Sequence, residues 1–183
     1  MSLLDIRVFG DPVLRKETAV VPTVTDDIRR LVDDMFETMY GAKGIGLAAP
    51  QVGRLERVAV IDDDRTRYTL VNPENVHQEG SIKGEEGCLS IPDIYADVER
   101  AAIVKVRALD ANGEPYELEG TELLGRCLQH EIDHLHGRLF VDKLSMLKKR
   151  SAAQKWEKLK GNYPGFVRKV VPGEFDDDKE DTL

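Results

Sequence analysis

The sequence predicts a single α+β domain, in which short strands form mixed or antiparallel sheets around a buried central helix, with further helices towards both termini. Two segments, 25–40 and 121–136, carry apolar residues at helical spacing, and the region between them holds short apolar runs and an Asn-Gly pair. The chain has 183 residues, 41% of them hydrophobic, which is enough to bury one core. We therefore expect one compact domain over residues 1–160 and an acidic tail with glycine and proline over 161–183.

The first predicted element is an amphipathic helix over residues 25–40. Thr25 is a suitable N-cap, and Asp26 and Asp27 suit the positive end of the helix dipole. Its apolar residues recur every three or four positions and so share one face: Ile28, Leu31, Val32, Met35 and Met39. That face should pack against the core.

Strands are predicted in the middle of the chain. A glycine-rich loop over 41–53 follows the first helix, and short runs rich in β-branched residues come after it. The predicted strands cover 56–62, 67–73, 76–83 and 101–109. The pair Asn112-Gly113 between two alternating stretches is a strong hairpin signal, so the chain should turn back on itself there.

The segment 121–136 predicts the central helix. Thr121 stands at its start and Gly137 just past its end. Two neighbouring stripes cover most of its circumference with apolar or chemically unusual side chains, so this helix should be buried. A third helix is expected over about 145–160, where apolar residues stand among many lysines. Those apolar residues are Leu147, Trp156 and Leu159.

Charge and composition exclude several functional classes. The formal net charge is −8, which argues against broad electrostatic binding to DNA, although residues 143–160 form a basic segment ahead of the acidic tail. Asp5 and Arg7 interrupt the N-terminal apolar residues, so the sequence predicts neither a secretory signal nor a membrane span, and a cytoplasmic protein is expected. Two cysteines are too few for a disulfide framework.

Residues 130–134 carry the strongest chemical signal in the sequence. His130, Glu131 and His134 form the pattern H-E-x-x-H, and the four-residue spacing brings both imidazoles onto one helix face, where they can share one metal ion. Glu131 then projects beside the metal. Catalytic sites of this kind usually take three protein ligands and keep a further position for water, so a third ligand must come from elsewhere in the chain.

Cys88 is the preferred third ligand and Glu157 an alternative. Phe140 stands where the third histidine of the metzincin peptidases would be, and a phenyl ring cannot ligate. Cys127 would lie about 10 Å along the helix axis from His134, near or beyond the span of one shared ion, so core packing is expected for it. Glu157 could imitate the third ligand of a thermolysin-like peptidase, although it lies in a lysine-rich helix. Cys88 would complete a Cys-His-His set, which suits zinc or ferrous iron.

Three motifs, in this order along the chain, resemble those of the peptide deformylase family. They are Gly44-Ile45-Gly46-Leu47-Ala48-Ala49-Pro50-Gln51, Glu86-Gly87-Cys88-Leu89-Ser90 and Gln129-His130-Glu131-Ile132-Asp133-His134. The likeness runs from about residue 5 to about residue 160. It implies a hydrolase that removes the formyl group from the N-terminal formyl-methionine of new polypeptides and releases formate.

The resemblance also implies roles for the motif residues. One divalent ion, Fe²⁺ in the first place and Zn²⁺, Ni²⁺ or Co²⁺ as alternatives, would be held by Cys88, His130 and His134. Glu131 would take a proton from water and deliver it to the leaving nitrogen. The Gln51 side-chain amide and the Leu89 backbone N–H would face the oxyanion. Substrate binding would involve Gly44, Ile45, Gly46, Glu86, Arg100, Leu123, Arg126 and Cys127.

The expected partners are formyl-methionyl nascent peptides and, through the basic segment 143–160, the ribosome, whose surface is rich in phosphate. Neither DNA nor a membrane is expected as a partner. Two other functions stay open at this point. The chain could be an H-E-x-x-H zinc peptidase that uses Glu157, or a non-catalytic metal-binding module associated with the ribosome.

Overall fold

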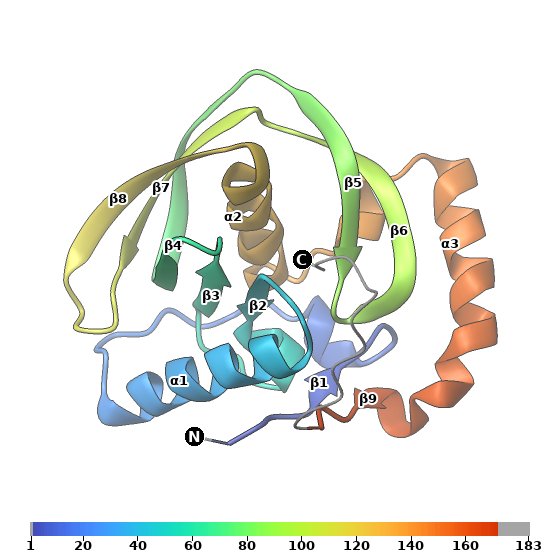
Figure 1. The fold of residues 1–183 in the computed structure, drawn as a ribbon, viewed down its shortest axis with the longest axis horizontal. Helices are drawn as coiled ribbons and strands as arrows, with labels where there is room; N and C mark the ends of the chain where they lie inside the picture. The colour runs from blue at the N-terminus through green and yellow to red at the C-terminus, as the bar shows by residue number, and fades with distance from the viewer. Residues whose placement is uncertain (1, 172–183) are drawn as a thin grey trace.

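The computed structural model describes residues 2–171, and a five-stranded antiparallel sheet is its largest element of β-structure (Figure 1). In sheet order, the strands are β2 (Gly46–Ala48), β3 (Val58–Asp62), β4 (Arg67–Glu79), β7 (Ile103–Leu109) and β8 (Pro115–Thr121). The helix α2 (Glu122–Leu135) packs against β2, β3, β7 and β8, so it is covered by this sheet on one side. The central buried helix of the prediction is therefore confirmed.

The predicted hairpin at Asn112-Gly113 is confirmed as the turn between β7 and β8. Gly113 has a φ of +82°, which a residue without a Cβ adopts at no steric cost. The register runs from Ile103 opposite Thr121 to Leu109 opposite Pro115 without interruption. The alternating residues on both sides of the pair therefore form a regular antiparallel ladder.

A second hairpin forms a separate two-stranded sheet beside α2. It consists of β5 (Ile82–Cys88) and β6 (Ile91–Arg100). The structure divides the predicted strand 76–83 between β4 and β5, because the chain turns at Gly80, where φ is +69°. β6 was not predicted, because its acidic residues, which have low strand propensity, obscure the alternation of buried and exposed positions.

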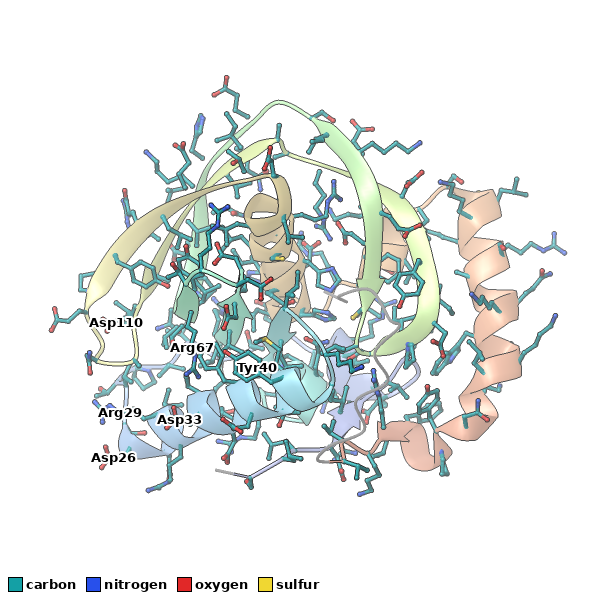
Figure 2. The ribbon with its side chains drawn as sticks, viewed as in Figure 1. Asp26, Arg29, Asp33, Tyr40, Arg67 and Asp110 are labelled. Atoms are coloured by element: carbon teal, nitrogen blue, oxygen red, sulfur yellow. The ribbon has the colours of Figure 1, made fainter. Side chains whose placement is uncertain are left out.

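The helix α1 (Asp26–Gly41) confirms the first predicted helix. Oγ1 of Thr25 accepts a hydrogen bond from the Ile28 N–H at 3.4 Å, and the apolar face predicted for this helix is buried. The Arg67 guanidinium lies 4.0 Å from the centre of the buried Phe36 ring and 5.7 Å from that of Tyr40, which attaches the sheet to the helix. Arg67 and Tyr40 are labelled in Figure 2. The Tyr40 hydroxyl also donates to Asp62 at 2.5 Å.

The helix α3 (Met146–Leu159) confirms the third predicted helix and packs beside β6. Ser145 caps it by accepting from the Lys148 N–H at 3.4 Å. Trp156 is buried and stacks on Tyr163, with ring centres 5.8 Å apart. Leu147, by contrast, is 80% exposed, so only a narrow stripe of α3 reaches the core.

Residues 161–171 fold onto the domain, whereas the sequence places the start of a tail at residue 161. Strand β9 (Val167–Arg168) pairs antiparallel with β1 (Ile6–Arg7). The described part of the chain also contains short 3₁₀ helices: η1 (Pro12–Arg15), η2 (Ala49–Val52), η3 (Phe140–Lys143), η4 (Lys160–Asn162) and η5 (Pro164–Phe166). The acidic residues of the predicted tail, over 174–181, lie outside the described residues.

Three apolar clusters hold these elements together. One lies between α1 and the strands β2 and β3, one between α2 and the large sheet, and one between β6, η3 and α3. Together they make one compact α+β domain with antiparallel sheets, as predicted. Within residues 2–171, no helix is both long and apolar enough to span a membrane.

Candidate metal centre

Three metal-binding side chains from two elements meet in the interior. Cys88 ends β5, while His130 and His134 stand one turn apart on α2. Sγ of Cys88 lies 3.3 Å from Nε2 of His134, which lies 3.2 Å from Nε2 of His130, and the three ligand atoms are all within 4.8 Å of one another. Ligand atoms of one tetrahedral ion are about 3.3–3.6 Å apart when metal–ligand bonds are about 2.0–2.3 Å long. The three side chains therefore fit one such ion.

The surroundings of these ligands affect their protonation. Burial raises the pKa of the Cys88 thiol, while hydrogen bonds from the backbone N–H groups of Ser90 and Ile91 act in the opposite direction. Burial lowers the pKa of His134 well below its usual range, which keeps its imidazole neutral. Thiolate and neutral imidazole are the forms that bind metal, and a nearby cation favours the thiolate.

Gly46 of β2 provides space for the Glu131 carboxyl group. A Cβ at residue 46 would lie 2.4 Å from Oε1 of Glu131, so a glycine is needed at this contact. Glu131 is fully buried, and neither of its carboxyl oxygens has a hydrogen-bond partner within residues 2–171. Burial consequently raises the pKa of Glu131 well above its usual range. Such a group is free to exchange a proton with a molecule that enters the site.

Gln51 borders the ligands with its side-chain amide in a fixed orientation. Its Oε1 accepts from the Ala48 N–H at 2.8 Å, which identifies the other atom of the amide as the donor. Nε2 then lies 3.2 Å from Oγ of Ser90 and 3.6 Å from Sγ of Cys88. The donor group of Gln51 therefore lies at the edge of the candidate metal centre.

Leu89 directly follows the ligand Cys88 and is held by the glycine loop. A Cβ at Gly44 would lie 2.5 Å from Cδ1 of Leu89. The glycine of the first motif therefore leaves room for the Leu89 side chain of the second motif. Leu89 is 1% exposed. Its backbone position is therefore fixed by packing on a neighbouring segment.

Glu86 lies at the centre of a buried ion cluster behind His130. One carboxyl oxygen is 3.0 Å from Nδ1 of His130, and the two oxygens accept from Arg100 at 2.5 and 2.9 Å and from Arg126 at 2.8 Å. Burial would raise the pKa of Glu86, but Arg100 and His130 hold it well below its usual range. The carboxylate thus favours a proton on Nδ1 of His130 and leaves Nε2 free to ligate.

Arg100 belongs to the same buried cluster, and its contact with a bound peptide stays a prediction. The Arg100 side chain is 2% exposed, and its remaining contact runs from Nη1 to Oδ2 of Asp133 at 2.7 Å. The guanidinium of Arg126 also faces the protein, because it donates to the carbonyls of Val98 and Ile82 at 3.0 and 3.3 Å. Both arginines compensate the buried carboxylate between them, which would otherwise be unpaired.

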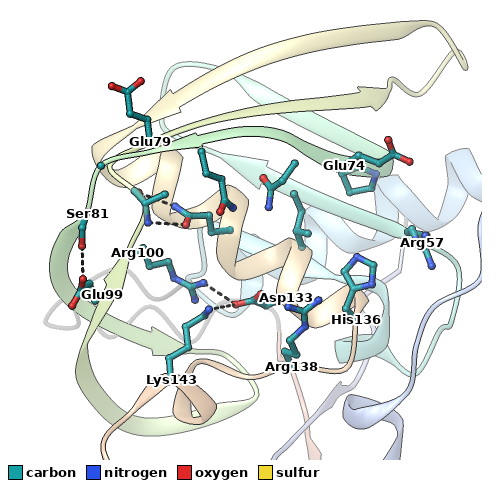
Figure 3. A pocket seen from close by; sticks show the side chains of 17 residues that line it. Arg57, Glu74, Glu79, Ser81, Glu99, Arg100, Asp133, His136, Arg138 and Lys143 are labelled. Atoms are coloured by element: carbon teal, nitrogen blue, oxygen red, sulfur yellow. Dashed lines mark hydrogen bonds and ion pairs between the residues drawn. The ribbon is translucent and has the colours of Figure 1, made fainter.

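A polar groove of about 990 Å³ lies on the opposite side of α2 from the metal ligands. Gln129, Ile132, Asp133 and His136 line it from the helix. Asp133 lies between Arg100 and Lys143 at the groove wall, with both ion pairs visible in Figure 3. Asp133 therefore links this groove, through the ion cluster of Glu86, to the back of His130.

The motif residues that build this centre belong to one protein family. A family model described as polypeptide deformylase matches residues 3–150 of the chain. The chain belongs to the polypeptide deformylase family. Deformylases are metal-dependent hydrolases, and Cys88, His130 and His134 form the candidate metal site of this one.

Individual deformylases resemble the chain over most of its length. A peptide deformylase of Alkalilimnicola ehrlichii is 55% identical over 163 residues, which cover 87% of this chain and 92% of the relative. A peptide deformylase of Hydrogenovibrio crunogenus is 50% identical over a match that covers 86% of this chain and 95% of the relative. The crystal structure of a peptide deformylase from Legionella pneumophila has a TM-score of 0.84 at 47% identity and covers 88% of this chain and 97% of that one.

Glu157, the alternative third ligand, lies outside this deformylase site. It is on α3, forms an ion pair with Lys160 at 2.6 Å, and its side chain is 64% exposed, whereas the histidines and Cys88 are buried. The zinc-peptidase alternative is therefore not supported. Membership of an enzyme family gives no support to a non-catalytic module either.

The remaining predicted substrate-binding residues of the deformylase occupy different environments. Ile45 and Cys127 belong to the apolar cluster between α2 and the sheet, and they are 7% and 1% exposed. Leu123, in the first turn of α2, is 51% exposed. Contact of these three residues with a substrate stays a prediction.

The sequence predicted no role for two polar residues of the deformylase motifs. Ser90 accepts the hydrogen bond of the Gln51 amide, and Asp133 pairs with Arg100. Their presence inside the second and third motifs was the available signal. Their partners could not be predicted, because those partners lie on other elements of the fold.

Proposed function

We propose that this chain removes the formyl group from N-terminal formyl-methionine of newly made polypeptides, with release of formate and a free amine. One observation carries the proposal: a buried Glu131 carboxyl group without a hydrogen-bond partner in the described chain adjoins a Cys-His-His ligand set. Solved relatives are also peptide deformylases, among them one from Ehrlichia chaffeensis in complex with actinonin, at 38% identity and a TM-score of 0.83.

The metal in this proposal is a divalent ion held by Cys88, His130 and His134. One thiolate and two imidazoles suit Fe²⁺, the ion proposed here, and they also accept Zn²⁺, Ni²⁺ or Co²⁺. Such an ion supplies Lewis-acid activation of water at neutral pH. The Glu86 carboxylate supports the ligand set by keeping Nε2 of His130 directed to the ion.

The chain's own residues carry out the proton transfers and stabilise the oxyanion. Glu131 accepts a proton from the attacking water while the oxygen of that water bonds to the formyl carbon. The Gln51 amide and the Leu89 N–H donate to the oxygen that gains negative charge. Glu131 then gives its proton to the amide nitrogen, the carbon–nitrogen bond breaks, and formate and the free amine leave.

Preference for a formyl group follows from the confined space at the glycine loop. A formyl carbon carries only hydrogen besides its oxygen and nitrogen, whereas other acyl groups carry a carbon chain. Gly44 and Gly46 already accommodate Leu89 and Glu131 at van der Waals contact. Larger acyl groups would have to displace these side chains, so they should be excluded.

The decisive experiment measures formate release from formyl-Met-Ala-Ser by anaerobically prepared, metal-loaded protein. The parent chain should release formate, while Glu131→Gln, which cannot accept the proton, should lose at least about 100-fold in kcat. Metal content of both proteins is measured as a control. Absence of formate release from the metal-loaded parent chain would refute the proposed function, and full activity of Glu131→Gln would refute the role of Glu131.

Docking on the ribosome belongs to the same proposal, as does action in the compartment of translation, the cytoplasm. The exposed face of α3 carries five cations: Lys148, Lys149, Arg150, Lys155 and Lys158. Charge reversal by K148E and R150E should weaken co-sedimentation with ribosomes at moderate salt, because contacts to phosphate dominate such binding. Lys83→Glu on β5 is the control. Equal binding of all variants would contradict docking through α3.

A further inference from the structure

Residues 163–171, here called the C-terminal strap, lie beyond the residues that the family model matches. The strap contains η5 and β9, and β9 pairs with β1 near the turn between β5 and β6 (Figure 1). The Val8 N–H extends this pairing by donating to the Phe166 carbonyl at 2.9 Å. The strap is therefore tied to the N-terminal segment by backbone hydrogen bonds.

Two glycines show how closely the strap packs on the domain. A Cβ at Gly10 would lie 2.4 Å from Cε1 of Phe166, and a Cβ at Gly41 would lie 2.8 Å from Cγ1 of Val170. Gly10 precedes η1, and Gly41 ends α1 at the entrance to the glycine loop. Side chains at the two ends of the strap thus rest on two different segments of the domain.

Between these anchors, the Arg168 side chain reaches the loop that follows the ligand Cys88. Its Nη1 donates to the carbonyl oxygen of Leu89 at 3.4 Å. The next carbonyl, that of Ser90, accepts from the Phe9 N–H at 2.8 Å. The carbonyl groups of Leu89 and Ser90, which follow the metal ligand Cys88, therefore both accept hydrogen bonds from residues in or next to the paired strands β1 and β9.

We propose that Arg168 is a positioning residue for deformylation, which acts through the backbone of Leu89. This inference rests on the proposed function, in which the Leu89 N–H donates to the oxyanion. A hydrogen bond to the Leu89 carbonyl restricts rotation of Leu89 on its carbonyl side, and the packing of its side chain on Gly44 restricts the residue further, so the residue that carries the proposed donor is held in one orientation. Donors that are oriented before the reaction stabilise developing charge more than donors that must reorient.

The contacts of Ser90 extend the same effect to the second oxyanion donor. Its carbonyl is held by Phe9, while its Oγ accepts from Nε2 of Gln51 at 3.2 Å. Arg168 and Phe9 thus fix consecutive residues, of which one carries a proposed donor and the other positions the second. The strap acts on geometry at the reacting carbonyl and makes no contact with Cys88 among the hydrogen bonds of residues 2–171.

The test compares three variants of the full-length, metal-loaded chain. Arg168→Ala removes the hydrogen bond to Leu89, and Arg168→Lys retains a cationic donor. Lys169→Ala is the matched control, because Lys169 is the next residue, carries the same charge, and pairs at the surface with Asp5. For each protein, kcat and KM for formyl-Met-Ala-Ser, metal content and Tm are measured.

Arg168→Ala should lower kcat about three- to tenfold, as expected for one lost hydrogen bond that supports a transition-state donor. KM should change less than about twofold, metal content should stay at the parent level, and Arg168→Lys should recover part of kcat. Lys169→Ala should retain the parent kcat.

Equal kcat for Arg168→Ala and Lys169→Ala would overturn the inference. A loss that appears only in KM, or that follows a loss of metal or a fall in Tm below that of Lys169→Ala, would also overturn it. In all of these cases the parent chain still releases formate. Failure of the parent chain itself would instead refute the proposed function.

Discussion

A buried carboxyl group without a hydrogen-bond partner destabilises a folded chain by about 1–3 kcal/mol. Glu131 is such a group within residues 2–171, and Gly46 is the residue that allows it to be there. The chain therefore retains an unfavourable residue at the point where proton transfer is proposed.

Gly46→Ala tests this contact at the residue scale. The new methyl group would lie 2.4 Å from Oε1 of Glu131 and must displace the carboxyl group, so kcat should fall at least about tenfold. Gly161→Ala is the control, because a Cβ there meets no atom within 4 Å. Steady-state formate release checks both variants, and an unchanged kcat for Gly46→Ala would contradict the steric argument.

At the scale of elements, the end of α2 is fixed to the N-terminal segment. Asp142 of η3 accepts from both terminal nitrogens of Arg15 at 2.6 and 3.0 Å, and its Oδ2 accepts from the Leu139 N–H at 2.9 Å. Gly137 lies against the Arg15 carbonyl, where a Cβ would be 2.6 Å from the oxygen. These contacts set where the chain leaves the helix that carries both histidines.

The contacts of Asp142 predict a pH-dependent contribution to the stability of the fold. Burial would raise the pKa of Asp142, but hydrogen bonds from Arg15 and Leu139 lower it below its usual range. A carboxyl group with a lowered pKa in the folded state stabilises fully above its unfolded pKa of about 4 and loses that contribution as the pH falls through the folded value.

Asp142→Asn should therefore reduce the free energy of unfolding at pH 7 by about 1 kcal/mol or less, since the two side chains are 39–45% exposed. Urea unfolding of the parent and variant should show this difference at pH 7 and a smaller one below pH 4. A difference that is constant with pH would show that the charge of Asp142 is not its cause.

At the scale of the whole molecule, metal binding should couple to stability. The ligand atoms come from β5 and α2, so an ion bound between them joins the hairpin to the central helix. Zn²⁺ at about 100 times its dissociation constant should raise the free energy of unfolding by about 2.7 kcal/mol, and Tm by about 5–10 °C. Calorimetric scans of the parent chain and of Cys88→Ala, with and without Zn²⁺, measure this shift in Tm. The shift should be much smaller for Cys88→Ala, and equal shifts would show that the ion binds elsewhere.

Much of this architecture could be predicted from local patterns. Apolar spacing predicted α1, α2 and α3, and the Asn112-Gly113 pair predicted the hairpin between β7 and β8. The three motifs predicted which segments meet around His130 and His134, because the fold of a recognised family fixes their arrangement. Such features depend on neighbours in sequence or on a complete motif.

What could not be predicted depends on partners distant in sequence. The ion pairs of Arg100 with Glu86 and Asp133 could not be predicted. Residues 161–171 were expected to trail from the domain, but β9 pairs with β1. This pairing could not be predicted, because β9 is short and its partner strand lies near the other end of the sequence. Neither charge nor composition indicates such partners, since they are set by the assembled fold.

The glycines of the site carry a consequence for sequence variation. Gly44 leaves space for Leu89, Gly46 for Glu131 and Gly84 for Arg126. A Cβ at residue 84 would lie 2.8 Å from Nη2 of Arg126. Each glycine is thus one half of a complementary pair whose other half lies on a distant segment. Substitution at these positions should show epistasis: a methyl group becomes acceptable only after its partner has become smaller, so the pairs can drift through evolution only together.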